Sequence, residues 1–487
     1  MTLVEDIITS SHDGDVAYAV FDNHKRNDHK PYVFRTDDRG RTWRDISGDL
    51  PEWGSVHTIA EDHVDPNLLF VGTEFGLFYS QNRGENWTQL KANFPTIDVR
   101  DIEIQRREND LVVGTFGRGV YILDDYSPLR TAADRIQESE ATLFPVRDSW
   151  IYVEGDVWGP SGGAQAFNGD NFWVADNPPF GAVFTYVMRD GLKSLSKTRR
   201  DAEIKIEKEG GDTPYPSWET LRAEDREDEP AILFIVKDAA GNVVRRITGP
   251  SGKGLHRVAW DLRYPAPDPV QLTPPPPSVF GSPQVGPLVV PGEYSVTLAK
   301  RVNGVVSELS EPQSFTLKPL HDTPEATTNR PELLAFQQET AKLARVVSAT
   351  TSTSSELRNR LAHLKLSIET VGGPSDSLRA QVQSLETQLD NADVKLNGDR
   401  TVSGRNEPAP WSIRARVSQV RGWGWQSQSP ATGSSKDALE IAKADLNTVL
   451  GEMRGIEAGI SRIEDQLEAL GAPFTPGSGV PSWTLED

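Results

Sequence analysis

An eight-residue stretch that occurs twice decides the fold of the N-terminal part: TDDRGRTW at positions 36–43 and SQNRGENW at positions 80–87. The two tryptophans that end it are 87 − 43 = 44 residues apart. A second pair, NLLFVGT at 67–73 and NDLVVGT at 109–115, repeats after 109 − 67 = 42 residues. This spacing, with short strand-like segments between the landmarks, is typical of the four-stranded blades of a β-propeller.

The residue types of this motif have a structural interpretation. The acidic or amide side chain at its third position can accept hydrogen bonds from turn amides, and its glycine can adopt a left-handed backbone at low cost. The tryptophan is a large apolar plug between one blade and the next. We therefore interpret ten residues as structural: Thr36, Asp38, Gly40, Thr42, Trp43, Ser80, Asn82, Gly84, Asn86 and Trp87.

The first copy resembles the Asp-box of BNR repeats, S/T-x-D-x-G-x-T-W, which occurs in sialidases and in sortilin/VPS10-type propellers. The second copy departs from that pattern at Asn82 and Asn86. The segments 65–67, 71–77 and 114–121 resemble blade turns of the VPS10-like group. The resemblance implies a propeller fold and an extracytoplasmic location, either periplasmic or secreted. It does not imply an activity, because many non-enzymes carry Asp-boxes.

Residues 1–126 contain only three such units, and the third ends before its outer strand. Closed propellers have four to eight blades. We therefore expect a partial Asp-box propeller whose missing blades come from upstream sequence or from a partner chain. Of these two, truncation is the simpler account: the chain would then be the C-terminal portion of a longer protein. Residues 127–142 are predicted to be a linker.

The middle zone, residues 143–320, predicts an Ig-like β-sandwich. It contains short apolar strands such as 231–236 and the alternating segment 255–263, separated by turn signals. The sets DAAGNVVR, GLHRVAWDLR and PGEYSVTL resemble the Ig-like domain of FlgD-type proteins, which implies a binding or spacer module. Residues 191–229 are highly charged and predict a solvated insertion.

After a Pro-rich linker at 321–331, the C-terminal zone predicts an antiparallel helical bundle over 332–471 and a tail at 472–487. Apolar residues from Leu446 to Leu470 alternate in steps of three and four, which is a heptad pattern. The expected helices are 332–371, 375–397 and 436–471. Trp411, Trp423 and Trp425 lie between the last two helices. We expect these tryptophans to pack against the helices. The alternative is that they form a platform on which a ligand stacks.

Composition excludes several classes of protein. Against 71 acidic residues there are 51 Lys and Arg, a formal net charge of −20, which disfavours nucleic acid as a partner. With zero Cys, disulfides and thiolate chemistry are excluded. The N-terminal residues show no secretory signal, and no apolar run is long enough for a membrane span.

Candidate catalytic residues are few. A sialidase-like site needs arginines and carboxylates at the channel mouth, and Glu74, Arg118 and Glu61 are the candidates. The spacing of His57, Glu61 and His63 predicts no zinc site, since these residues fall on a strand. We expect no metal and no cofactor. The sequence thus favours a non-catalytic binding or scaffold protein for protein, peptide or glycan ligands. The alternative is a sialidase-like glycoside hydrolase whose site lies largely in the missing blades.

Overall fold

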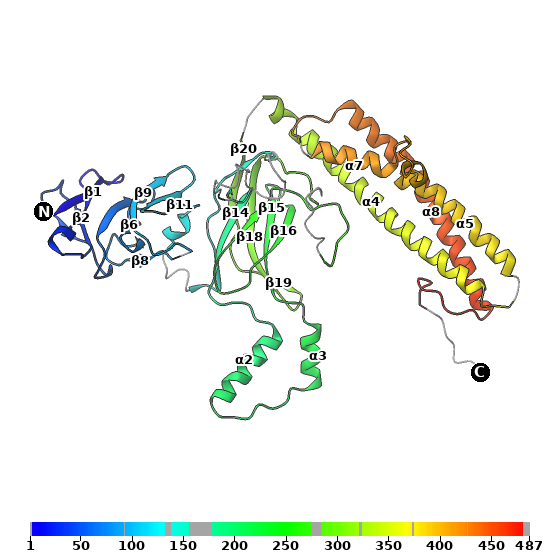
Figure 1. Ribbon diagram of the computed structural model, residues 1–487, viewed down its shortest axis with the longest axis horizontal. Helices are drawn as coiled ribbons and strands as arrows, with labels where there is room; N and C mark the ends of the chain where they lie inside the picture. The colour runs from blue at the N-terminus through cyan, green and yellow to red at the C-terminus, as the bar shows by residue number, and fades with distance from the viewer. Residues whose placement is uncertain are drawn as a thin grey trace. The chain divides into compact units, whose positions relative to one another are not determined.

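The computed structural model describes residues 2–91, 93–131, 138–154, 175, 177–273, 284–320, 324–372, 375–425 and 427–480. The chain forms two compact units (Figure 1). The first comprises Met1–Asp148, Pro178–Trp260 and Tyr294–Phe315, and the second comprises Ser149–Asn177, Asp261–Glu293 and Thr316–Asp487. Both units take residues from the predicted sandwich zone, and the predicted domain boundaries stay a prediction.

Three antiparallel sheets follow one another in the first unit, each with its strands in chain order. Blade 1 contains β1 (Leu3–Thr9), β2 (Ala17–Asp22), β3 (Tyr32–Thr36) and β4 (Arg44–Asp45). Blade 2 contains β5 (Val56–Glu61), β6 (Leu69–Thr73), β7 (Gly76–Ser80) and β8 (Thr88–Gln89). Blade 3 contains β9 (Val99–Gln105), β10 (Asp110–Thr115) and β11 (Val120–Leu123). This up-and-down order is the propeller-type arrangement that the repeat predicts.

Blade 2 is covered on both faces, because successive residues of a strand point to opposite sides of its sheet. In β6, Leu69 and Val71 pack into a core shared with Val20 and Val33 of blade 1. Phe70 packs on the other side, into a core with residues of blade 3 that include Leu111 and Val113. The apolar pattern of the repeat thus builds two cores, one on each side of the middle sheet.

The first unit also holds most of the sandwich zone. One sheet has the order β12 (Ala141–Leu143), β14 (Ala182–Met188), β17 (Gly254–Trp260). The other sheet has the order β20 (Gln313–Pro319), β18 (Gly292–Val302), β15 (Ala231–Asp238), β16 (Val243–Gly249), with β19 (Val305–Glu308) beside β18. Strand β13 (Ser149–Ile151), which pairs with the last residues of β20, is assigned to the second unit. Phe184 stacks on Phe234 with 5.4 Å between ring centroids, which joins the two sheets. The charged insertion forms α2 (Leu195–Lys208) and α3 (Trp218–Arg226), neither of which has a buried residue.

The second unit contains the C-terminal helices. They are α4 (Pro324–Ile368), α5 (Ser375–Asn397), α6 (Arg400–Ser403), α7 (Ile413–Gly424) and α8 (Gly433–Ala469). The heptad residues of α8, from Leu446 to Leu467, are buried in one core with residues of α4, α5 and α7. Helix α4 begins at Pro324, inside the segment that the sequence predicts to be a linker. Helix α7 occupies a region where the sequence predicts no helix.

Parts of the predicted linkers and tail, residues 132–137, 321–323 and 481–487, lie outside the described residues. Within the part of the chain that is described, no helix has the length and apolar character that a membrane span requires.

Candidate functional site

The structure separates the three candidate catalytic residues. We call the end of the blades at which β2, β6 and β10 finish and β5 and β9 begin the loop end. Glu74 follows β6, and Arg118 lies in the turn after β10, so both lie at the loop end. Glu61 is the last residue of β5 and pairs with Leu69, whereas Val56 at the start of β5 pairs with Thr73. Five residues of strand, about 17 Å at ~3.3 Å each, therefore separate Glu61 from the loop end.

Glu61 joins blade 2 to blade 1. Its carboxylate accepts hydrogen bonds from Ser10 Oγ at 2.7 Å, from the Ser11 amide at 2.9 Å and from the Tyr18 hydroxyl at 2.9 Å. Burial raises the pKa of Tyr18, and the negative charge of Glu61 raises it further. These contacts give Glu61 a structural role between the two sheets.

A histidine, a carboxylate and a guanidinium meet at the loop end, between β5 and β9. Arg100 Nη2 lies 2.6 Å from Asp98 Oδ2. His57 Nε2 lies 3.4 Å from Asp98 Oδ1, but neither of these two buried atoms makes a hydrogen bond. Burial lowers the pKa of His57, and the positive charge of Arg100 lowers it further. Both effects favour the neutral form of the imidazole over the charged one.

A second cluster at the loop end is built around Asp22. Its Oδ1 accepts hydrogen bonds from the His24 amide and from Ser55 Oγ, both at 2.8 Å, and its Oδ2 contacts His24 Nδ1. Burial alone would raise the pKa of Asp22, but the hydrogen bonds from His24 and Ser55 outweigh it and hold the pKa below its usual value. The Ser55 amide donates to Glu74 at 3.4 Å. A general acid needs the opposite pKa shift, so Asp22 does not have the properties of a proton donor.

Arg118 is exposed at the loop end. Gly117 and Gly119 beside it have φ angles of 84° and 72°, a conformation that favours glycine. The side chain of Arg118 has no hydrogen bond or ion pair among the described residues. Nearby in the same turn, the exposed ring of Phe116 lies 5.6 Å from the guanidinium carbon of Arg100. Two guanidinium groups and an aromatic ring suit the binding of an acidic, polar or aromatic group.

The two Asp-box turns lie at the end of the blades opposite the loop end. Asp38 Oδ1 accepts from Thr36 Oγ1 at 2.9 Å and from the Thr42 amide at 2.8 Å, and Oδ2 accepts from Thr42 Oγ1 at 2.7 Å. The bonds from the Thr42 amide and hydroxyl lower the pKa of Asp38. In both turns the glycine amide donates to the first side chain of the motif, Gly40 to Thr36 at 2.9 Å and Gly84 to Ser80 at 2.8 Å.

In the second turn, Asn82 takes the place of the aspartate. Its Oδ1 accepts from Ser80 Oγ at 2.9 Å and from the Asn86 amide at 3.0 Å. Its Nδ2 donates to Asn86 Oδ1 at 3.0 Å, so an amide pair stands where the first turn has a carboxylate and a hydroxyl. The departure from the Asp-box pattern therefore keeps the same turn with neutral groups.

A buried network that the sequence does not reveal lies at this same end of the blades. Asp62 is fully buried, and its two oxygens accept from Arg130 Nε and Nη2, both at 2.8 Å, and from the Tyr126 hydroxyl. Burial would raise the pKa of Asp62, but the bonds from Arg130 and Tyr126 outweigh it and lower the pKa. The sequence offers no local signal for this network, because residues 62–65 read as a turn and 127–142 as a linker.

The described residues contain no group of three His, Asp or Glu side chains that could hold a metal ion. His57 and Glu61 lie at the two ends of one strand, so the H-x-x-x-E-x-H spacing brings no ligands together. At the loop end, the carboxylates Asp22, Asp98 and Glu74 are each in contact with a neighbouring donor.

No protein-family model matches the sequence, and no curated protein matches it. Solved structures give partial likenesses. An ancestral GH74 enzyme is 20% identical over 24% of this chain and 14% of its own, with a TM-score of 0.20. The GH74 xyloglucanase from Xanthomonas campestris is 14% identical over 63% of this chain and 38% of its own, with a TM-score of 0.22. YCF48 from Cyanidioschyzon merolae is 16% identical over 39% of this chain and 65% of its own, with a TM-score of 0.18.

The chain spans 14%, 41% and 31% of the lengths of three such structures, the ancestral GH74 enzyme, YCF48 bound to D1 peptide and an extracellular domain from B. thetaiotaomicron. At these TM-scores the likenesses carry no argument about site or activity. The propeller-type arrangement rests on the three sheets themselves.

Proposed function

We propose that this chain is a non-catalytic binding and scaffold module of an extracytoplasmic BNR/VPS10-like propeller protein, whose ring is completed by further blades. One observation carries the proposal. Trp87 of blade 2 is 7% exposed, whereas Trp43, at the same position of the motif in blade 1, is 43% exposed. Trp87 packs in a core with residues of blade 1, whereas no described sheet packs on Trp43.

The outer face of blade 1 is apolar. Ile7 pairs with Ala19, and Ala19 pairs with Phe34, so these residues lie on the side of the sheet opposite the core residues Val20 and Val33. Ile7 is 61% exposed. We call this surface the first open face; it consists of Val4, Ile7, Phe21, Phe34 and Trp43.

The outer face of blade 3 is apolar along β10 and β11 and acidic along β9, where Glu103 pairs with Val112 and Asp101 with Gly114. Val112 pairs with Ile122, and both lie on the side opposite the core residues Leu111 and Val113. Ile122 is 60% exposed. We call this surface the second open face; it consists of Val112, Val120 and Ile122. Among the described residues β11 has no strand beyond it, so its free edge is available for pairing.

The occupant that fits both open faces is another propeller blade. Blade 2 shows what such a face normally contacts, because each of its two sides packs on a sheet of the same kind. Apolar faces of this sort mark interaction surfaces in soluble proteins. The extra blades come either from a further stretch of the same polypeptide or from a partner chain, and the proposal needs only that they are β-sheets.

The ligand surface we assign is the loop end, with Arg118, Phe116 and Arg100 as the contact residues. Its exposed guanidinium groups and aromatic ring fit a peptide, protein or glycan that carries acidic or polar groups. The carboxylates nearby hold the loops in place through His24, Ser55 and Arg100. This division of roles supports binding rather than bond cleavage.

The test is binding of the purified chain to peptide and glycan arrays. We expect binding that Arg118→Ala and Phe116→Ala each reduce at least severalfold, with Arg41→Ala, an exposed arginine in the opposite turns, as the matched control. Binding that is unaffected by the first two changes would contradict the assignment of the loop end.

An assay on aryl-glycosides tests the same proposal for catalysis. Turnover that Glu74→Ala and Arg118→Ala abolish would replace the binding function with that of a glycoside hydrolase. We expect no such turnover.

A further inference from the structure

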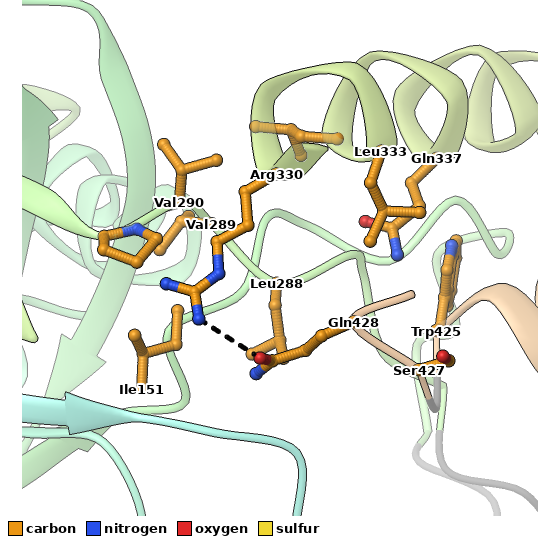
Figure 2. A pocket seen from close by; sticks show the side chains of 12 residues that line it. Ile151, Leu288, Val289, Val290, Arg330, Leu333, Gln337, Trp425, Ser427 and Gln428 are labelled. Carbon is orange, nitrogen blue, oxygen red and sulfur yellow. Dashed lines mark hydrogen bonds between the residues drawn. The ribbon is translucent and has the colours of Figure 1, made fainter. Parts of the chain in front are cut away.

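The three tryptophans between α5 and α8 have different surroundings. Trp425 is 6% exposed and lines a small cavity beside α4 (Figure 2). Trp411 and Trp423 are 52% and 72% exposed, and both line a second pocket of about 520 Å³, which we call the α7 pocket. The expected packing against the helices therefore fits Trp425 but not the other two. One exposed tryptophan is common on a protein surface, whereas two in the wall of one pocket point to a ligand.

Helix α7 forms one wall of the α7 pocket with the face that it turns away from the bundle. The buried residues of the helix lie on its other side; they are Ile413, Val417 and Val420. Ala415, Gln419 and Trp423 follow one another at intervals of four residues and so form one stripe, with Trp411 just before the helix. All four line the pocket. From Ala415 to Trp423 the stripe is about 12 Å long, so the two indoles flank an elongated surface.

The segment from the end of α5 to α6 forms another wall of the α7 pocket, with Asn397, Gly398, Asp399, Arg400 and Ser403. Hydrogen bonds fix its conformation, because Asp399 Oδ1 accepts from the Thr401 amide at 2.8 Å and from the Val402 amide at 3.2 Å. A Cβ at Gly398 would lie 3.8 Å from Ser412 Oγ, so the segment lies against the N-terminal cap of α7. The two walls are therefore held together without a ligand.

Three polar side chains of the α7 pocket remain for contacts with a ligand. Among the described residues, the side chains of Arg400, Ser403 and Gln419 form no hydrogen bond or ion pair. A guanidinium, a hydroxyl and an amide together offer both donors and acceptors. Of the described residues that line the pocket, only Asp399 and Arg400 are charged, and their formal charges cancel. The lining thus suits a polar ligand without net charge.

We propose that the α7 pocket binds a neutral oligosaccharide, whose sugar rings stack on Trp411 and Trp423 and whose hydroxyl groups bond to Arg400, Ser403 and Gln419. A sugar ring has an apolar C–H face for an indole and a rim of hydroxyl groups that donate and accept. The volume of about 520 Å³ falls within the usual range of ligand pockets. Nucleic acids also stack on aromatic rings, but their phosphates need basic residues, which this lining and the net charge of −20 do not provide. The site is separate from the loop end and does not depend on it.

Calorimetric titration of the full chain tests the class of ligand. The probes are cellotetraose, xylotetraose, laminaritetraose and chitotetraose, the disaccharide of each, and decaproline, because proline-rich peptides also dock on aromatic side chains. We expect at least one tetrasaccharide to bind, and its disaccharide to bind about tenfold more weakly, since it is too short to contact both indoles. Binding of decaproline alone, binding of no tetrasaccharide, or equal affinity for the disaccharide would overturn the proposal.

Variants locate the oligosaccharide on the chain. Trp411→Ala and Trp423→Ala should each lower the affinity about tenfold, the effect of one lost stacking contact. Both side chains are mostly in water, so the two variants should keep the fold. The matched control is Trp218→Ala, which removes a 69% exposed tryptophan of α3 and should leave the affinity unchanged. Arg118→Ala separates this site from the loop end: binding that is lost in Arg118→Ala but retained in both Trp411→Ala and Trp423→Ala would contradict the α7 site.

Discussion

Trp43 and Trp87 occupy the same place in the same motif, 87 − 43 = 44 residues apart, yet only one of them is part of a core. Trp87 donates from Nε1 to the Ile46 carbonyl at 3.0 Å, and its amide donates to Asp49 Oδ1 at 2.6 Å. Ile46 directly follows β4 of blade 1, and Asp49 lies in the segment that leads from blade 1 to blade 2. Trp43 has no such neighbour among the described residues and is 43% exposed. The motif therefore determines the conformation of the turn, whereas contact with an adjacent blade determines whether the tryptophan is buried.

Removal of each indole should give the largest difference in stability between the two tryptophan positions. Trp87→Ala should lower the free energy of unfolding by about 3–5 kcal/mol, the usual cost of deleting a buried aromatic side chain. Trp43→Ala should cost less than about 1 kcal/mol, because much of that side chain is already in water. Urea denaturation of the two variants and the wild type measures both values. Equal losses of free energy of unfolding would mean that Trp43 is buried by a part of the protein outside the three blades.

A second comparison concerns ion pairs on the blades. Arg130→Met leaves the fully buried Asp62 without its guanidinium, and we expect a loss of about 2–3 kcal/mol, below the full range for a buried pair because Arg130 keeps some exposure. Arg39→Met removes the exposed pair with Asp15 and should change the free energy of unfolding far less, because solvent screens the two charges. Denaturation curves of the two variants test the difference, which disappears if the Asp62 network adds no stability.

The glycines of the two turns allow a finer comparison. Gly40 and Gly84 have φ angles of 81° and 87°, so alanine is strained in both places. A Cβ at Gly84 would lie 2.9 Å from Ile46 Cδ1 of blade 1, whereas a Cβ at Gly40 would meet only its own turn's Trp43, at 3.8 Å. Gly84→Ala should therefore cost about 1 kcal/mol more than Gly40→Ala. Equal costs in free energy, measured by thermal or urea unfolding, would show that a side chain at position 84 does not clash with Ile46.

The smallest expected effect is on pH dependence. The pKa of Asp38 in the folded chain lies below its ordinary value of 3.8, so its contribution to stability is present above that value and is lost as the pH falls through the lowered folded pKa. Asp38→Asn should weaken this acid sensitivity, and Asn82→Asp should add it to the second turn. Thermal midpoints measured from neutral pH to below pH 3.8 test the prediction. Identical acid profiles for all three proteins would contradict it.

The sequence predicts the regular elements well, because they repeat a spacing. The 42- and 44-residue periods place the strands of the blades, and the heptad from Leu446 to Leu467 places α8, whereas Leu470 lies after the helix and is 41% exposed. Helix α7 was missed although Ser412 caps it and Ile413, Val417 and Val420 have helical spacing. The glycines and tryptophans in this segment obscure its short helical pattern.

The sites were less predictable, because they depend on register and on distant residues. Glu61 and Glu74 are both acidic residues at strand ends, and only the pairing of β5 with β6 shows that they lie at opposite ends. The network of Asp62, Tyr126 and Arg130 joins segments that look unrelated in the sequence. Arg330 fell within a predicted linker, yet it is a buried residue of α4.

Blade 2 is enclosed on both faces, whereas the outer faces of blades 1 and 3 are open. The chain has zero cysteines, so single cysteines report accessibility without interference. We predict that the thiols of Ile7→Cys and Ile122→Cys react rapidly with an aromatic disulfide reagent in the isolated chain, and that the thiol of Val71→Cys reacts only on unfolding. Slow reaction of the thiols at both position 7 and position 122 would contradict this description, because the outer faces of blades 1 and 3 would then be covered without further blades.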